Sequence, residues 1–151
     1  MANTQALCTS FKGELLTGTH NFGTGVVRAA TTADTFKAAL YLASATVNAS
    51  TTAYSSTGEV TGTNYTAGGA TVTNGNAPAT SGTTAYWTPS ASISFSNVTL
   101  STAFDAVLIY NSSQSNKAVS VHTFGSQTVT AGTFTLTMPT NDSSTGLIRL
   151  A

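Results

Sequence analysis

The side chains that could carry acid–base chemistry are few, and they lie far apart in the sequence. General acid–base catalysis usually needs two carboxylates side by side, or a histidine next to a carboxylate. Here every acidic residue stands alone, and neither histidine has the spacing to the other, or to Cys8, that metal ligands show. The residues concerned are Glu14, Asp34, Glu59, Asp105, Asp142, His20 and His122. The pattern predicts no catalytic residue, no metal site and no cofactor.

Motifs for nucleophilic catalysis and for nucleotide binding are also missing from the sequence. There is no Gly-x-Ser-x-Gly elbow and no Ser-x-x-Lys pair. The run Gly23-Thr24-Gly25 lacks the third glycine and the preceding strand that a dinucleotide-binding loop requires, and no Walker sequence occurs. We therefore expect a protein that is not an enzyme.

Several polar side chains have specific expected environments. Asp105 lies in an apolar segment, where it is either a carboxylate with a raised pKa or the ion-pair partner of Lys117 across a turn. His122 falls on a predicted strand, which favours a half-buried structural histidine. His20 lies in a glycine-rich link and is expected to be exposed, whereas Cys8 is expected to be a small core residue.

Aromatic residues provide the remaining candidate site. Tyr54, Tyr65, Tyr86 and Trp87 fall in the Gly-, Thr- and Ser-rich middle of the chain, outside the well-patterned strands. Three interpretations stay open for them. They pack beneath long loops, they form a protein–protein interface in which Tyr and Trp are enriched, or they stack on a sugar. We treat all four as interface candidates.

The composition excludes two classes of partner. Charged residues make up 7% of the 151 residues, against about 25% in an average domain, and the formal net charge is zero. Such a chain has no basic face to neutralise phosphates, so nucleic-acid binding is not expected. No run approaches about 18 apolar residues, the length of a membrane span. Because charge normally keeps surfaces apart, we expect a surface this poor in charge to be covered by partner subunits.

The hydrophobic pattern predicts an all-β protein, an antiparallel β-sandwich or jelly roll, forming a single domain over residues 1–151. Short segments with period-two alternation recur at intervals of roughly 8–12 residues, as in sandwiches. A short N-terminal helix is expected over residues 4–16, from the stripe Leu7, Phe11 and Leu15. Strands are expected at 36–42, 104–110, 118–124 and 147–150, with a bulge near 96–97, a loop at 74–82 and a hairpin at 129–138.

A resemblance to known proteins rests on six segments that together cover most of the chain in order. They are residues 8–22 (CTSFKGELLTGTHNF), 34–41 (DTFKAALY), 51–69 (TTAYSSTGEVTGTNYTAGG), 103–125 (AFDAVLIYNSSQSNKAVSVHTFG), 134–139 and 146–150. On these segments the chain resembles a group of small virion structural proteins of tailed bacteriophages, similar to head decoration or cement proteins. Residues 77–87 match the group least, so the resemblance gives Tyr86 and Trp87 no role.

The resemblance implies a non-enzymatic role in the virion. A cement protein binds between subunits of the major capsid protein and stabilises the head, usually as a homodimer or homotrimer on a symmetry axis. The alternative is a tail- or fibre-associated protein, either an adaptor or a module that binds a receptor or glycan. Either protein would be made in the cytoplasm of the bacterial host, in agreement with an N-terminus that lacks the pattern of a secretory signal.

Overall fold

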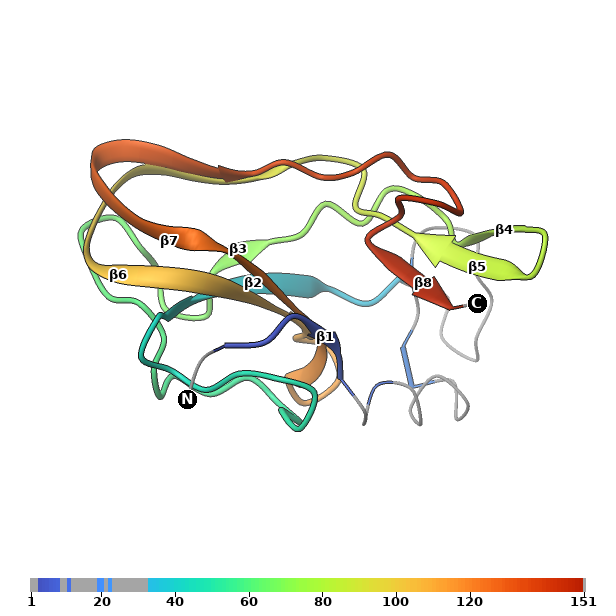
Figure 1. The fold of residues 1–151 in the computed structure, drawn as a ribbon, viewed down its shortest axis with the longest axis horizontal. Helices are drawn as coiled ribbons and strands as arrows, with labels where there is room; N and C mark the ends of the chain where they lie inside the picture. The colour runs from blue at the N-terminus through green and yellow to red at the C-terminus, as the bar shows by residue number, and fades with distance from the viewer. Residues whose placement is uncertain (1–2, 9–10, 12–18, 21, 23–32, 151) are drawn as a thin grey trace.

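The chain folds into two antiparallel β-sheets, as Figure 1 shows for the computed structural model, which describes residues 3–8, 11, 19–20, 22 and 33–150. The larger sheet has five strands in the order β1-β7-β6-β2-β3, and the smaller has three in the order β4-β5-β8. The strands are β1 (Ala6–Leu7), β2 (Phe36–Leu42), β3 (Ala70–Thr71), β4 (Ala79–Ser81), β5 (Thr84–Trp87), β6 (Ile93–Asn111), β7 (Lys117–Leu136) and β8 (Ile148–Leu150). The expected all-β, antiparallel class is confirmed.

A long ribbon made of β6 and β7 dominates the fold. The two strands pair along their whole length, from Ile93 opposite Leu136 to Asn111 opposite Lys117. The pairing shifts register repeatedly between Phe95 and Phe104, and Asn97 (φ 53°) and Ala131 (φ 45°) adopt left-handed backbone there. Bulges of this kind bend a strand and increase its twist. The ribbon therefore turns back on itself, so that its upper half runs above its lower half in Figure 1.

The core lies against the lower half of this ribbon, where β2 pairs with β6. Strand β2 is buried at five of its seven positions, and β6 from Ala106 to Asn111 is buried throughout. Near-continuous burial means that both faces of the sheet are covered, as expected for a central strand with apolar residues at successive positions. The expected strands at 36–42 and 104–110 are confirmed, and so is the bulge near 96–97.

A segment without regular strands, residues 43–69, covers part of this sheet and returns the chain to the β2 edge. Gly69 closes it, with φ 74° and an ideal Cβ position 1.9 Å from the carbonyl oxygen of Ala38. Only glycine fits this approach, because any side chain would overlap the β2 backbone. The next residue, Ala70, begins β3 and pairs with Ala38.

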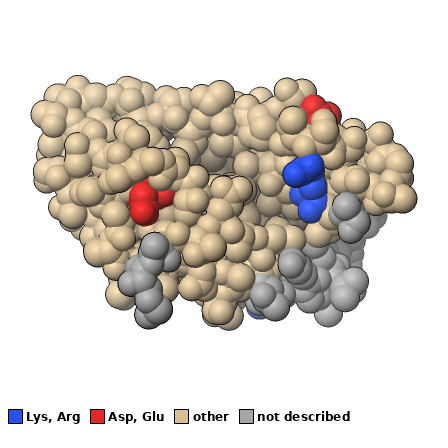
Figure 2. Space-filling model, viewed as in Figure 1, with Lys and Arg blue, Asp and Glu red and all other residues tan. Residues whose placement is uncertain are grey.

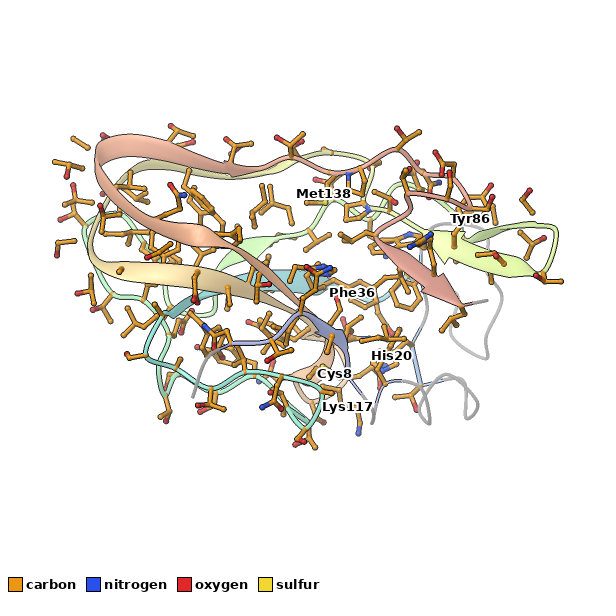
Figure 3. All side chains as sticks on the ribbon, in the orientation of Figure 1. Cys8, His20, Phe36, Tyr86, Lys117 and Met138 are labelled. Atoms are coloured by element: carbon orange, nitrogen blue, oxygen red, sulfur yellow. The ribbon has the colours of Figure 1, made fainter. Side chains whose placement is uncertain are left out.

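The small sheet packs its buried residues against the same core. Trp87 of β5 and Ile148 of β8 pair directly and belong to the cluster of buried apolar side chains that includes Phe36 of β2. Figure 3 shows Phe36 in the interior, between strands of the two sheets. The expected strand at 147–150 is confirmed as β8, one residue shorter.

Two local expectations are wrong, and a third is wrong in its first residues. The expected helix over residues 4–16 does not begin at residue 4, because Ala6–Leu7 pair as a strand with Val121 and Ser120 of β7. Phe11 is helical, and residues 9–10 and 12–16 lie outside the described residues, so the rest of this helix stays a prediction. Residues 129–138 do not form a separate hairpin, because they continue β7 opposite β6. The loop at 74–82 contains β4, whose short run Ala79–Ser81 pairs with β5. In each case pairing with another strand overrides the local pattern.

Candidate interaction site

Two of the four aromatic candidates point inward and share one buried carboxylate. Glu59 is only 6% exposed. Its Oε2 accepts a hydrogen bond from the Tyr54 hydroxyl at 2.6 Å, and its Oε1 accepts one from the Tyr65 hydroxyl at 2.8 Å and one from the N–H of Gly68 at 2.8 Å. A buried carboxylate with donors on both oxygens is satisfied within the fold. The Glu59 carboxylate therefore ties Tyr54, Tyr65 and Gly68 of this segment to one another.

Both tyrosine rings also pack within the fold. Tyr54 stacks on Tyr110 with ring centroids 4.7 Å apart, and Tyr65 stacks on Phe95 at 5.7 Å. The hydroxyl of Tyr65 accepts a further hydrogen bond from the N–H of Leu40 at 3.0 Å. Burial first, and then the Glu59 carboxylate, raise the pKa of both Tyr54 and Tyr65. Raised pKa values keep these hydroxyls protonated, as hydrogen-bond donation to a carboxylate requires.

The other two candidates, Tyr86 and Trp87, lie on β5 in the small sheet, and only one of them is fully buried. Trp87 is 2% exposed, packs on Phe22 at 4.9 Å and donates its indole N–H to the carbonyl oxygen of Asn76 at 2.9 Å. Tyr86 is half-buried and partly accessible. Successive residues of a strand point to opposite faces, so the pair divides between core and surface.

An apolar pocket of about 160 Å³ lies beside Tyr86. Leu150 of β8 lines it and is 38% exposed, the one large apolar side chain of the described residues in the exposed class. Tyr86 is labelled at this small sheet in Figure 3. Tyr86 borders this pocket, and tyrosine is enriched in protein interfaces. Its other lining residues include Pro78, Ala85, Trp87 and Ile148.

A second surface feature, the outer edge of β7, was not among the sequence predictions. Strand β1 pairs with β7 only at Ser120 and Val121, and within the described part of the chain no strand pairs with the outer edge from Thr123 to Leu136. Backbone N–H and C=O groups along such an edge are available to another strand. Most residues between Gly125 and Thr135 are exposed. We refer to residues 123–136 as the β7 edge.

An apolar groove of about 330 Å³ runs beside the β7 edge. Its aromatic part comes from β7 itself, where Phe124 and Phe134 lie with ring centroids 5.2 Å apart and are both only half-buried. Met138, which is labelled near the upper strands in Figure 3, extends the lining beyond the end of β7. The other apolar residues that line it are Ile93, Val107, Ile109, Leu136 and Leu147.

The other predicted polar side chains serve the fold. His122 is half-buried as expected, its Nε2 lies 2.9 Å from the Ser120 hydroxyl oxygen, and burial lowers its pKa to about 4. The Asp105 carboxylate accepts a hydrogen bond from the side-chain amide of Asn3. Cys8 is fully buried, as expected. Glu14 lies outside the described residues.

The expected exposure of His20 is wrong. The side chain is 8% exposed, its ring packs edge-on against Phe11 at 4.8 Å, and its Nδ1 lies 3.1 Å from the side-chain amide nitrogen of Asn111. Asn111 also donates to Asp34 at 2.8 Å. The glycine-rich local sequence therefore did not predict the burial of His20, because packing against residues distant in sequence decides it.

Charges and metal-ligating groups are sparse among the residues that the structure describes. No cluster of three or more His, Cys, Asp or Glu side chains lies close enough to hold a metal ion in this part of the chain. The face drawn in Figure 2 is almost entirely free of charged side chains. No helix within the described ranges has the length and hydropathy needed to span a bilayer.

One signal in the sequence marks the β7 edge. Between Lys117 and Asp142 there is no Asp, Glu, Lys or Arg, the charges with which exposed edge strands are normally protected. That signal became interpretable only when the pairing placed this run at the edge of a sheet. Comparisons with protein-family models, with curated proteins and with solved structures found no match to the chain.

Proposed function

We propose that the protein is a non-enzymatic structural protein of a bacteriophage virion. In this role it is a cement protein that binds between subunits of the major capsid protein and stabilises the head. It is made in the cytoplasm of the bacterial host and acts as a homo-oligomer. We further propose that the two sheets form a sandwich of jelly-roll type, which an experimental structure of the assembled protein would test.

The observation that carries this proposal is a folded surface with almost no charge. Charged side chains make up 7% of the sequence, and they are sparse on the face in Figure 2. A surface of hydroxyls and apolar groups is poorly suited to remaining alone in solution, since net charge is the usual protection against association. The same surface suits contacts that rely on area and on neutral hydrogen bonds.

Two separate contact features support a bridging role. The Tyr86–Leu150 pocket lies on the small sheet, whereas the β7 edge and its groove belong to the larger one. A protein that holds neighbouring subunits together needs at least two surfaces that bind at once. Repetition around a symmetric shell then adds avidity, because each contact raises the effective concentration of the next. The resemblance of six sequence segments to virion structural proteins points the same way.

The number of copies in purified virions tests the proposal directly. A cement protein is expected in hundreds of copies per particle, and particles that lack it should rupture at lower temperature or under milder osmotic stress. A dozen copies or fewer would contradict the cement role and favour the alternative, a protein associated with the tail or a fibre. Binding to host cells or glycans, tested with the purified protein, separates an adaptor from a receptor-binding module.

The contact surface itself is tested with Tyr86→Ala in a capsid-binding assay. The substitution removes an accessible aromatic ring of the small sheet, a residue type enriched at interface hot spots, so we expect binding to weaken at least about tenfold. Thr83→Ala, an exposed turn residue beside the same strand, is the matched control and should bind normally. Equal binding by both variants would remove Tyr86 from the interface.

A further inference from the structure

We propose that the β7 edge, residues 123–136, pairs antiparallel with the same edge of a second copy of this chain. The pairing forms a two-fold symmetric dimer whose larger sheets join into one. The inference deepens the proposed function and rests on it for its role in the virion. The pairing itself is a property of the isolated protein.

The first argument is that no strand of the described residues pairs with this edge, whereas the opposite side of the ribbon is covered. On the far side of the ribbon, the segment after β2 covers β6: Thr63 pairs with Thr99, and the side chain of Asn64 donates to the carbonyl oxygen of Asn97 at 2.8 Å. On the β7 side, pairing with β1 stops at Val121. Strand addition at a free edge uses main-chain hydrogen bonds that are already aligned.

The second argument is charge, and it selects a second copy as the partner. In an antiparallel pair of identical segments, a charge near the two-fold axis lies close to its own copy on the partner strand. Like charges directly opposite one another destabilise a sheet. From Ala118 to Met138 the chain has no Asp, Glu, Lys or Arg and no Pro. His122 does not break this neutrality, because burial lowers its pKa to about 4.

The third argument comes from the half-buried phenylalanines beside the edge. Phe124 and Phe134 leave part of their rings accessible in the groove of about 330 Å³. A partner strand added at the β7 edge brings its own Phe124 and Phe134 next to this groove, since side chains repeat on the same face of an extended sheet. Pairing therefore buries apolar surface as well as satisfying the backbone.

The geometry also limits the assembly to two copies. Antiparallel pairing of one edge with itself is isologous, so it generates a two-fold axis and uses up both edges. A closed dimer is thus expected, and a trimer built through this edge is excluded.

The test introduces charge on the edge without touching the core. Thr133 and Thr135 are both exposed on β7, so Thr133→Lys with Thr135→Lys places four lysines at the paired edge of a dimer. The matched control is Ser94→Lys with Ser96→Lys, which adds the same charge to exposed positions of β6, one strand further from the edge. Circular dichroism and thermal unfolding establish that both variants keep the fold.

Analytical ultracentrifugation of the purified proteins measures the association. We expect the wild type and the β6 control to form dimers, and the β7 variant to dissociate with a Kd at least about tenfold higher, because like charges meet across the pair. Hydrogen exchange gives a readout at residue level. Amides in residues 123–136 of the wild type should exchange more slowly at high than at low protein concentration, and those of the β7 variant should not.

Several results would overturn the pairing. They are a wild type that stays monomeric at high micromolar concentration, a trimer, equal dissociation of the two lysine variants, or exchange in residues 123–136 that is independent of concentration. None of these depends on a capsid, so the copy-number experiment can fail while the dimer stands. Conversely, high copy number in virions with a monomeric purified protein would contradict only the pairing.

Discussion

The hydroxyl of Tyr65 donates a hydrogen bond to Oε1 of Glu59 at 2.8 Å. The hydroxyl oxygen of Tyr65 also accepts a hydrogen bond from the backbone N–H of Leu40. The Tyr65 hydroxyl thus links the irregular segment directly to the central strand β2, and the buried carboxylate ties that segment together. Tyr54 binds the second carboxylate oxygen. The arrangement explains how about 27 residues without regular strands, from 43 to 69, stay ordered over the sheet.

Removing this carboxylate should destabilise the protein strongly. Glu59→Ala leaves two buried hydroxyl donors and the N–H of Gly68 without their acceptor and opens a cavity. We expect a loss of about 2–4 kcal/mol in the free energy of unfolding. Urea denaturation measures it. Tyr54→Phe is the control, since it removes one donor and leaves the carboxylate in place, and it should cost clearly less.

His122 should make stability depend on pH in the mildly acidic range. Burial lowers the pKa of His122 from 6.5 to about 4. Between these values the unfolded chain binds a proton that the folded chain does not, so the free energy of unfolding falls as the pH drops from about 6.5 towards 4. The full shift corresponds to roughly 3 kcal/mol.

The comparison with His122→Gln isolates this contribution from that of the carboxylates. The difference in stability between wild type and variant should change between pH 7 and pH 5, in the direction that disfavours the wild type at low pH. Glutamine places its amide near the position of Nε2, where Ser120 lies. A difference that stays constant with pH would show that His122 does not titrate as described.

Gly69 should tolerate no side chain. Its φ of 74° is left-handed, and a Cβ would lie 1.9 Å from the carbonyl oxygen of Ala38. Gly69→Ala is therefore expected to cost at least about 2 kcal/mol and to release β3 from β2. Gly125→Ala is the control, because a Cβ there meets nothing within 4 Å. Thermal melts should separate the two variants clearly, and similar melting temperatures would contradict the close approach.

Substitution of Trp87 should destabilise the core strongly, whereas substitution of Tyr86 should cost less stability. Trp87→Ala removes a 2% exposed side chain and is expected to cost about 3–5 kcal/mol. Tyr86→Ala removes a half-buried ring and should cost less. Because Trp87 is the sole tryptophan, its fluorescence follows unfolding directly in the wild type and in the Tyr86 variant. An emission spectrum unchanged on unfolding would contradict its burial.

The sequence by itself determined the class of fold and most of the central sheet. Alternating and continuous apolar runs identified residues 36–42 and 104–110 as strands, because burial of a strand depends on the same local periodicity that its sequence displays. The low charge could also be counted directly from the sequence.

Only the tertiary structure decided which residues meet. The local pattern divided residues 118–138 into a strand and a hairpin, whereas pairing with β6 makes them one strand with a bulge at Ala131 and Gly132. It also brought Tyr54, Tyr65 and Glu59 together and buried His20 against Phe11. It left the β7 edge without a paired strand among the residues that the structure describes. Side-chain type fixes which face of a strand is buried, but the register between strands far apart in sequence is set by the sum of all contacts across the core.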